Sequence, residues 1–347
     1  MKTKVSVLIC VVLFLINITG CSTGNSSTER LSNLIQDTRN DHFPVMTWKQ
    51  SEQYDEDSNA LKTNNHMETQ LHRIQVEDSA LTSPQGICCM NQGILVADQK
   101  KDRLVLCNPE GKVLKTVGKT GNGKNQFQGP YGMTVWKNRI YVIDSGNHRI
   151  VVLNQNLNMI SEISIPDFKD EEEKWFTDIA IDRSGEIYIC GVFLSHSGIY
   201  HRSLKGKESF KRLKGSDHFY GSLREKDGSV YALNKGYLYA IPKNKELGER
   251  KAKNALWKLS SSSVKKYRTL PTGMDIGSFL LTDHYCIGSS SYLQSIKVFD
   301  LKSGKYVSDL VSDHELSDHT YMDQKDGKIY LADSDSGNLY WLQAGNL

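Results

Sequence analysis

The sequence lacks the short motifs that mark the commonest catalytic and metal sites. It has no GxSxG, HExxH or P-loop pattern, and no pair of carboxylates spaced for acid–base chemistry. It also has no CxxC pair, so a structural zinc site is not expected. These absences favour a non-enzymatic role, and we expect no cofactor and no catalytic metal.

A strong charge bias is also missing. The chain has 43 basic and 40 acidic residues and a formal net charge of +3. Such a balance gives no whole-chain attraction to nucleic acid. The composition, 38% apolar and 24% charged, is that of an ordinary soluble domain. We therefore expect no nucleic-acid partner.

The N-terminal segment has the pattern of a secretory signal. Lys2 and Lys4 precede a short apolar stretch, residues 7–16, and the sequence Ile-Thr-Gly then leads into Cys21. This stretch is too short to span a bilayer comfortably. Small residues before a cysteine resemble the bacterial lipobox, which implies cleavage before that cysteine. We predict a signal peptide over residues 1–20 and attachment to the membrane through lipid at Cys21, held by two or three acyl chains.

Residues 21–68 are predicted to form the lipid anchor and a polar tether, because their composition is that of a linker. Ser22 stands where the retention rule known for enteric bacteria places an aspartate, and no acidic run follows Cys21. We therefore predict a bacterial membrane-anchored lipoprotein, in the outer membrane and facing the periplasm.

The remaining residues, 69–347, repeat one pattern of short strands. The six copies have first strands centred on Gly86, Gly132, Asp178, Gly221, Gly277 and Tyr321. The second strands, such as Ile140–Asp144, are apolar on both faces, as in a sheet that is covered on both sides. A four-stranded meander that repeats about every 40–50 residues is typical of a propeller blade. The pattern predicts an all-β, six-bladed β-propeller of four-stranded antiparallel blades.

The second copy resembles an NHL repeat. The resemblance lies in Gly129–Val135 and Ile140–Leu153, and the preceding residues 121–128 are similar to the glycine-rich, Phe-containing start of that repeat. The first copy fits in part. As a whole the sequence is similar to the six-bladed, TolB-like propeller lipoproteins common in Bacteroidetes. This resemblance implies a ligand face made by the loops that enter the first strands and those that join second to third strands.

Several polar residues fall at that predicted face. The candidates are Tyr131, Asp178, His218, Tyr220, His319 and Tyr321. We interpret the chain as a binding or scaffolding module for a protein, peptide or glycan ligand. The alternative is a metal-dependent hydrolase or lyase with its site at the central channel. Calcium enzymes of related propellers need several converging carboxylates, whereas Asp178 is the one candidate carboxylate here.

Two sets of residues have a structural interpretation. Asp98, Asp144 and Asp333 recur at one repeat position, which predicts turn stabilisation by side-chain-to-backbone hydrogen bonds. Five cysteines remain after Cys10 and Cys21. All five lie in or beside apolar strand runs, which favours buried thiols over disulfides. They are Cys88, Cys89, Cys107, Cys190 and Cys286.

The fourth copy and the chain ends carry three further predictions. The third strand of the fourth copy is expected at Tyr237–Ile241, followed by a basic insertion over residues 243–263 with a short helix around Glu249–Leu259. This insertion is either an extended, solvated hairpin or a lobe that faces a partner or the membrane. The polar tail after Leu342 is too short for a last strand. We therefore predict that Thr69–Val76 pairs with Leu339–Leu342 and closes the ring.

Overall fold

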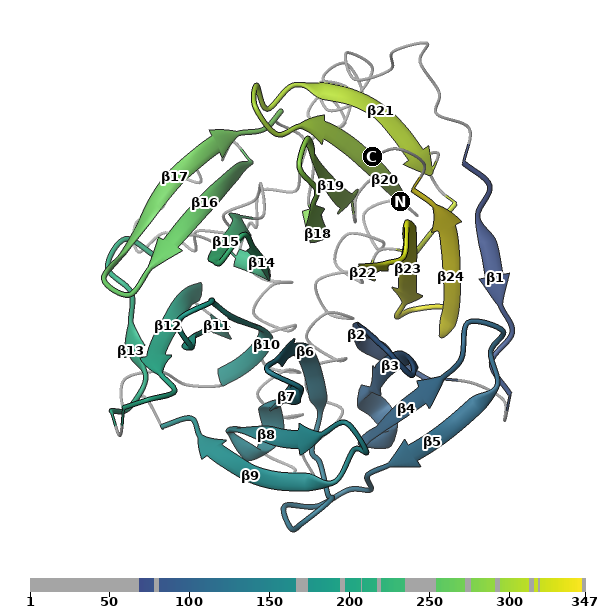
Figure 1. Ribbon diagram of the computed structural model, residues 1–347, viewed down its shortest axis with the longest axis vertical. Coiled ribbons are helices and arrows are strands. Elements are labelled where there is room, and N and C mark those ends of the chain that lie inside the picture. Colours follow the sequence, from purple (N-terminus) through teal and green to yellow (C-terminus); the bar gives the residue numbers. More distant parts are fainter. Residues whose placement is uncertain are drawn as a thin grey trace, which may run out of the picture.

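The computed structural model describes residues 69–77, 81–166, 174–193, 197–206, 208–216, 220–234, 254–271, 276–290, 294–311, 315–317 and 319–344. Within these ranges the chain forms six antiparallel sheets of four strands each. The sheets stand around a common axis, with the first strand of each sheet nearest to that axis (Figure 1). The predicted six-bladed propeller is confirmed.

The first three blades follow one another along the chain. Blade one has β2 (Pro84–Met90), β3 (Gly93–Asp98), β4 (Arg103–Cys107) and β5 (Val113–Val117). Blade two has β6 (Pro130–Trp136), β7 (Arg139–Asp144), β8 (Arg149–Asn154) and β9 (Met159–Ser164). Blade three has β10 (Lys174–Ile181), β11 (Glu186–Phe193), β12 (Ser197–Ser203) and β13 (Lys211–Arg212). The short 3-10 helices η1 (Gln99–Lys101) and η2 (Ser145–Asn147) join second to third strands in blades one and two.

The last three blades complete the circle. Blade four has β14 (Tyr220–Lys226), β15 (Ser229–Asn234), β16 (Ala255–Ser260) and β17 (Ser263–Thr269). Blade five has β18 (Ile276–Leu281), β19 (Tyr285–Ser290), β20 (Ser295–Asp300) and β21 (Tyr306–Val311). Blade six has β22 (Thr320–Lys325), β23 (Lys328–Asp333) and β24 (Asn338–Gln343), with β1 (His72–Ile74) as its outermost strand.

The ring is closed by the N-terminal strand, as predicted. In the antiparallel pair of β1 and β24, His72 lies opposite Trp341 and Ile74 lies opposite Leu339. The imidazole of His72 stacks on the Trp341 indole with 4.2 Å between ring centroids. Figure 1 shows β1 along the outer edge of blade six, beside blade one. The two ends of the propeller are therefore held in one sheet.

The core lies between neighbouring blades rather than inside any one of them. Along β7, Ile140 and Val142 pack into the cluster shared with blade one, whereas Tyr141 and Ile143 pack into the cluster shared with blade three. Successive strand residues point to opposite faces. This sandwiching explains why the second strands are apolar without alternation.

Small residues let the first strands approach one another near the axis. A Cβ atom at Gly86 would lie 2.5 Å from the carbonyl oxygen of Tyr131. The first strands of blades one to five also carry a β-bulge at this end. Because the bulge adds a residue, the register places Ser222 and Ser278 at the position of Gly86. The assignment of Gly221 and Gly277 to that position was therefore wrong.

Blade four differs from the prediction in its outer half. Its third strand is β16, which pairs with β15 and β17, so the helix expected around Glu249–Leu259 is wrong for residues 255–259. Leu256 and Leu259 are buried in this strand, and tertiary packing of these side chains overrides the local helical tendency. The strand expected at Tyr237–Ile241 and most of the basic insertion lie outside the described residues.

Candidate functional site

Two tyrosines from distant blades meet at the predicted ligand face. Tyr131 comes from the bulge of β6, and Tyr321 comes from β22. Their hydroxyl groups are hydrogen-bonded to each other. The Tyr321 hydroxyl also donates to Oε1 of Gln85 at 2.6 Å. Blades one, two and six thus contribute one side chain each to a single polar contact.

The amide of Gln85 is fixed on its other side as well. Its Nε2 atom donates to the Ser334 hydroxyl at 2.7 Å and to the Ser83 hydroxyl at 3.2 Å. All three residues are buried. The network therefore orients the Gln85 carbonyl oxygen toward Tyr321 and holds the tyrosine pair in place.

The solvent-facing side of this cluster is a histidine–aspartate pair. Nδ1 of His319 lies 3.0 Å from Oδ2 of Asp335, and their side chains are 27% and 37% exposed. Burial opposes ionisation of Asp335, but its hydrogen bond to His319, the charge of His319 and a hydrogen bond from Ser317 outweigh that effect and lower the pKa of the carboxyl. A carboxylate in this position orients the imidazole ring through the hydrogen bond at Nδ1.

The environment keeps both tyrosines protonated. Burial raises the pKa of Tyr131 and of Tyr321 well above the usual range, and the negative charge of Asp335 raises both further. At neutral pH the cluster therefore offers phenolic hydroxyls, a carboxamide, an imidazole and a carboxylate on one face. Such a set can bind polar groups of a ligand by hydrogen bonds.

An ion pair spans the channel below this face. Asp178 of β10 accepts hydrogen bonds from its neighbour Ile179 and, on Oδ2, from the Ser222 hydroxyl, the Leu223 amide and the Arg224 guanidinium. The same guanidinium donates to the Ser278 hydroxyl at 3.2 Å and to the Met322 carbonyl at 2.9 Å. Arg224 thereby ties blades three, four, five and six together, and the Asp178 carboxylate is occupied by protein donors.

Arg224 was missed by the sequence analysis, although the repeat contains a signal for it. The register places Arg224 at the same position as Cys88, Ala180 and Leu280 of other blades, so a charge there is anomalous. Asp323 occupies that position in blade six and accepts a hydrogen bond from the Cys89 amide at 2.6 Å. Burial raises the pKa of Asp323, and the charge of Arg224 only partly offsets this.

The six candidate residues of the predicted ligand face thus do not all lie in one cluster. Tyr131, Tyr321 and His319 gather in one cluster, whereas Asp178 lies deeper in the ion pair with Arg224. Tyr220 begins β14 opposite Asn234. The side chain of Tyr220, all of His218 and the proposed lipidation site lie outside the described residues. In the part of the chain that the structure describes, no three His, Cys, Asp or Glu residues converge in a way that could hold a metal ion.

The recurrent aspartates stabilise loops, as predicted. Asp98 accepts hydrogen bonds from the Thr82 and Ser83 amides, just before the first strand of its own blade. Asp144 accepts one from the Gln128 amide at 2.7 Å. Burial raises the pKa of Asp144, although hydrogen bonds from Asn147, Gln128 and Arg149 act against it. These carboxylates therefore connect the two kinds of loop that make up the predicted ligand face.

The cysteines of the described chain are unpaired thiols, as expected. Cys88, Cys107, Cys190 and Cys286 are buried, and Cys89 is partly buried. Burial raises the pKa of Cys107 to about 11 and that of Cys286 to about 12. Protonated, buried thiols are poor nucleophiles and behave as small apolar side chains.

Comparison with known proteins agrees with this architecture. A family model described as a 6-bladed beta-propeller matches residues 38–344, and the chain belongs to this family. No curated protein sequence matches the chain significantly. Among the described residues, no helix has the length and apolar character needed to cross a bilayer.

Solved structures with a similar fold include two lyases. Virginiamycin B lyase from Staphylococcus aureus has a TM-score of 0.53 and 11% identity, over 80% of this chain and 99% of the lyase. A catalytically inactive variant of that enzyme with quinupristin has a TM-score of 0.52 and 10% identity, over 80% and 99%. A streptogramin B lyase has a TM-score of 0.52 and 10% identity, over 81% and 99%. At this identity the likeness concerns the fold alone.

Proposed function

We propose that this protein is a lipid-anchored, extracytoplasmic binding or scaffolding module, attached through Cys21 to the outer membrane and facing the periplasm. Its protein, peptide or glycan ligand binds at the face that carries Tyr131, Tyr321 and His319. In this proposal the propeller is of the NHL-like and TolB-like kind found in Bacteroidetes lipoproteins. The ring supplies a rigid frame, and the loops supply the contacts.

The observation that carries the proposal is the polar cluster of Gln85, Tyr131, Tyr321, His319 and Asp335. Its inner members are buried and fix one another, while the His319–Asp335 pair is open to solvent. Preorganised polar groups of this kind lower the entropy cost of binding a polar ligand. The Arg224 guanidinium joins blades three, four, five and six near the axis and occupies the Asp178 carboxylate, which favours binding at the His319–Asp335 surface.

The ligand face can be tested by photo-crosslinking in the native cells. A photoreactive residue at exposed Ser336, beside the His319–Asp335 pair, is expected to capture a partner. The same residue at exposed Ile160, on the outer strand β9, serves as the control and should capture none. Mass spectrometry of the adduct then distinguishes protein, peptide and glycan. Adducts of equal yield from both positions, or a yield unchanged by Tyr321→Phe with His319→Ala, would refute the proposed face.

The anchor has a separate test. Metabolic labelling with an acyl-chain analogue should mark the wild type and not Cys21→Ala, and the variant should leave the membrane fraction. Separation of inner and outer membranes then checks the predicted location. Equal labelling of both proteins would contradict lipidation at Cys21.

The alternative function, a metal-dependent hydrolase or lyase at the channel, has one observation in its favour. The His319–Asp335 pair next to two phenols has the composition of an acid–base site. Elemental analysis of protein purified without added metal decides between the two functions. Stoichiometric calcium or zinc, lost together with His319→Ala, would favour the enzyme.

A further inference from the structure

The outer half of blade four concentrates positive charge. Between Asn254 and Pro271, which covers β16 and β17, the sequence has four basic residues and no acidic residue. Lys258, Lys265 and Lys266 are exposed, and Arg268 is partly exposed. The whole chain is close to balance, so this local excess belongs to one blade edge and not to the general composition.

The register makes this arrangement unfavourable for the isolated protein. Lys258 of β16 lies directly opposite Lys265 of β17. Like charges at directly opposite strand positions destabilise a sheet. Neither ammonium forms an ion pair with any described residue. An anion outside the described chain would remove this repulsion.

The cations of the edge lie against aromatic rings. The Lys266 ammonium is 5.4 Å from the Trp257 ring centroid, and the Arg268 guanidinium is 4.7 Å from that of Tyr267. The Lys258 ammonium is 5.7 Å from the Tyr231 ring. These cations cover ring faces that a sugar ring would otherwise stack on. The Arg268 guanidinium also donates to the Leu301 and Tyr267 carbonyls, whereas Lys258 and Lys266 are exposed to water.

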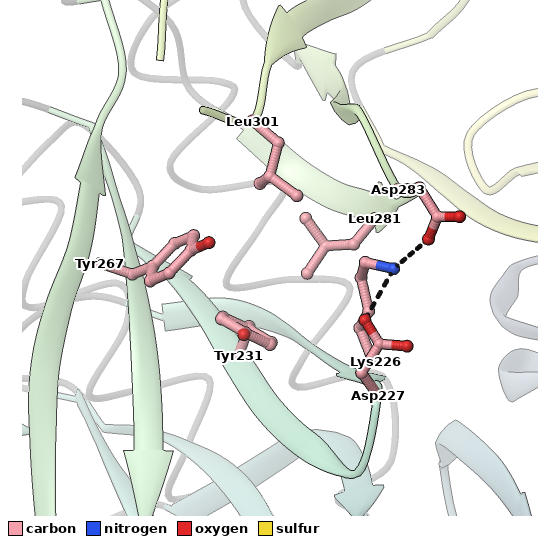
Figure 2. A pocket seen from close by; sticks show the side chains of 7 residues that line it. All are labelled: Lys226, Asp227, Tyr231, Tyr267, Leu281, Asp283 and Leu301. Atoms are coloured by element: carbon pink, nitrogen blue, oxygen red, sulfur yellow. Dashed lines mark hydrogen bonds and ion pairs between the residues drawn. The ribbon is translucent and has the colours of Figure 1, made fainter. Parts of the chain in front are cut away.

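A groove between blades four and five adjoins this edge. It has a volume of 310 Å³, with Tyr231, Tyr267, Leu281 and Leu301 along its wall. Figure 2 shows the two tyrosines on one side of the groove and the leucines facing them. Tyrosines with one apolar and one polar end are typical of surfaces that meet the interface between water and lipid.

The groove also contains a lysine whose charge is neutralised by carboxylates of the protein itself. At its rim, the Lys226 ammonium lies 2.7 Å from Asp283 and 3.0 Å from Asp227. Figure 2 shows this lysine between its two carboxylates. Lys258 and Lys265 differ from Lys226 in their acidic partners. Within one blade, one lysine has two acidic partners and the edge lysines have none among the described residues.

We propose that the outer edge of blade four docks on the anionic headgroups of a phospholipid bilayer. The charge of the edge is of one sign and its rings are covered by cations, so it fits a charged surface better than a ligand that stacks on aromatic rings. Each basic residue near an anionic leaflet contributes about a factor of five to binding. This contact is separate from the ligand face and from acylation of Cys21, and it would orient the propeller on the membrane.

Sedimentation with vesicles tests the proposal. The probe is the chain from residue 22 onward, which keeps all described residues and carries no acyl group. It should bind vesicles of phosphatidylglycerol and phosphatidylcholine in equal parts, and not vesicles of phosphatidylcholine alone. Lys258→Gln with Lys265→Gln should weaken this binding about thirtyfold, since two basic residues are lost. Added salt should abolish it by screening.

A matched variant controls for net charge. Lys119→Gln with Lys124→Gln removes two exposed lysines between β5 and β6, and binding should fall less than twofold. Equal loss in both double variants, or equal binding to both vesicle types, would overturn the proposal. Soluble glycerol phosphate should not compete at millimolar concentration. If it does, or if an acidic polysaccharide binds more tightly than vesicles, the edge recognises a free anion instead of a bilayer. Unchanged thermal melting of both variants excludes misfolding as the cause.

Discussion

Blades two and four share a strand plan but place their cations differently. In blade two, Arg149 is 7% exposed, and its guanidinium donates to the carboxylates of Asp144 and Glu162. It also donates to three carbonyl groups within residues 122–126. One charged side chain thus fastens the loop that leads into its own blade. The Arg149 cation of blade two therefore stabilises the internal structure of that blade.

In blade four the cations of the outer strands lie over aromatic rings and reach solvent. Only the inner strand behaves like blade two, because Arg224 is paired with Asp178. The comparison shows that blade two, whose sequence fits the repeat well, uses its buried charges to fix a loop. The blade that departs from the repeat leaves charge on its surface, where it is available to a partner.

Both blades depend on the closed ring, so the largest effect is expected from opening it. Deleting residues 22–76 removes β1 and should lower the free energy of unfolding by about 4 kcal/mol, from lost strand hydrogen bonds and the buried Ile74 side chain. Deleting residues 22–65 should leave stability nearly unchanged. Thermal and urea unfolding of both truncations measure the difference. If both unfold alike, β1 contributes nothing to closure.

The second-largest effect is a difference in stability loss between variants of blade two and blade four. Arg149→Ala should cost about 3–5 kcal/mol, because it leaves the fully buried Asp144 carboxylate without its cation. Arg268→Ala in blade four should cost only about 1 kcal/mol, because its guanidinium is partly exposed and donates to the Leu301 and Tyr267 carbonyls rather than to a buried carboxylate. Urea unfolding of the two variants makes the comparison. Equal costs would show that blade four also relies on its cations for stability.

A smaller effect is expected at the channel. Arg224→Met keeps most of the volume but removes the ion pair and should cost about 2 kcal/mol. The Asp178 carboxylate keeps its hydrogen bonds from Ile179, Ser222 and Leu223, which limits the loss. The readout is the urea midpoint, with Lys226→Met as the partly exposed control from the same strand. An equal loss of stability in Lys226→Met and Arg224→Met would argue against a stabilising role for the Arg224 contacts between blades.

The smallest effect is a difference in pH dependence. Folding raises the pKa of Asp144, so its contribution is fully present below the ordinary value of 3.8 and is lost as pH rises through the raised value. The hydrogen bond from Lys226 lowers the pKa of Asp283, so its contribution is present above 3.8 and is lost only at lower pH. Relative to Asp144→Asn, the wild type should lose stability between pH 3.8 and neutrality. Relative to Asp283→Asn, it should not change in that range.

Most of the fold could be predicted from the sequence because the six copies of the repeat can be aligned with one another. The inner strands of six copies, such as Ile140–Asp144, share one apolar pattern, and each copy supports the others. The closing strand was predictable because the last copy lacked a partner for Leu339–Leu342. The outer half of blade four was not, because its third strand follows a long insertion and Leu256 is placed by contacts with the next blade.

The candidate site was predictable only in part. Position in the repeat identified Tyr131, Tyr321 and His319 as residues of one face. It could not reveal that Gln85 contacts Tyr321, since that contact joins blades that are far apart in sequence. The pairing of Asp335 with His319 lies within blade six and depends on how its two loops fold. Asp178 illustrates the same limit. Its carboxylate was a candidate ligand group by type, but Arg224, supplied by the next blade, occupies it.

The closing strand has a mechanical consequence. Any pull on the chain ahead of residue 69, including one from the proposed anchor, reaches the propeller first at β1, which is three residues long and pairs in its sheet with β24 alone. Its other attachments are the packing of Ile74 against blade one and the hydrogen bond from the Glu77 amide to the Gly111 carbonyl. A force applied from the N-terminal side would therefore separate β1 from β24 before it acts fully on any complete blade. β1 cannot pair with β24 until the last blade has been synthesised. The ring thus stays open during synthesis, and it closes only when β1 and β24 are both present.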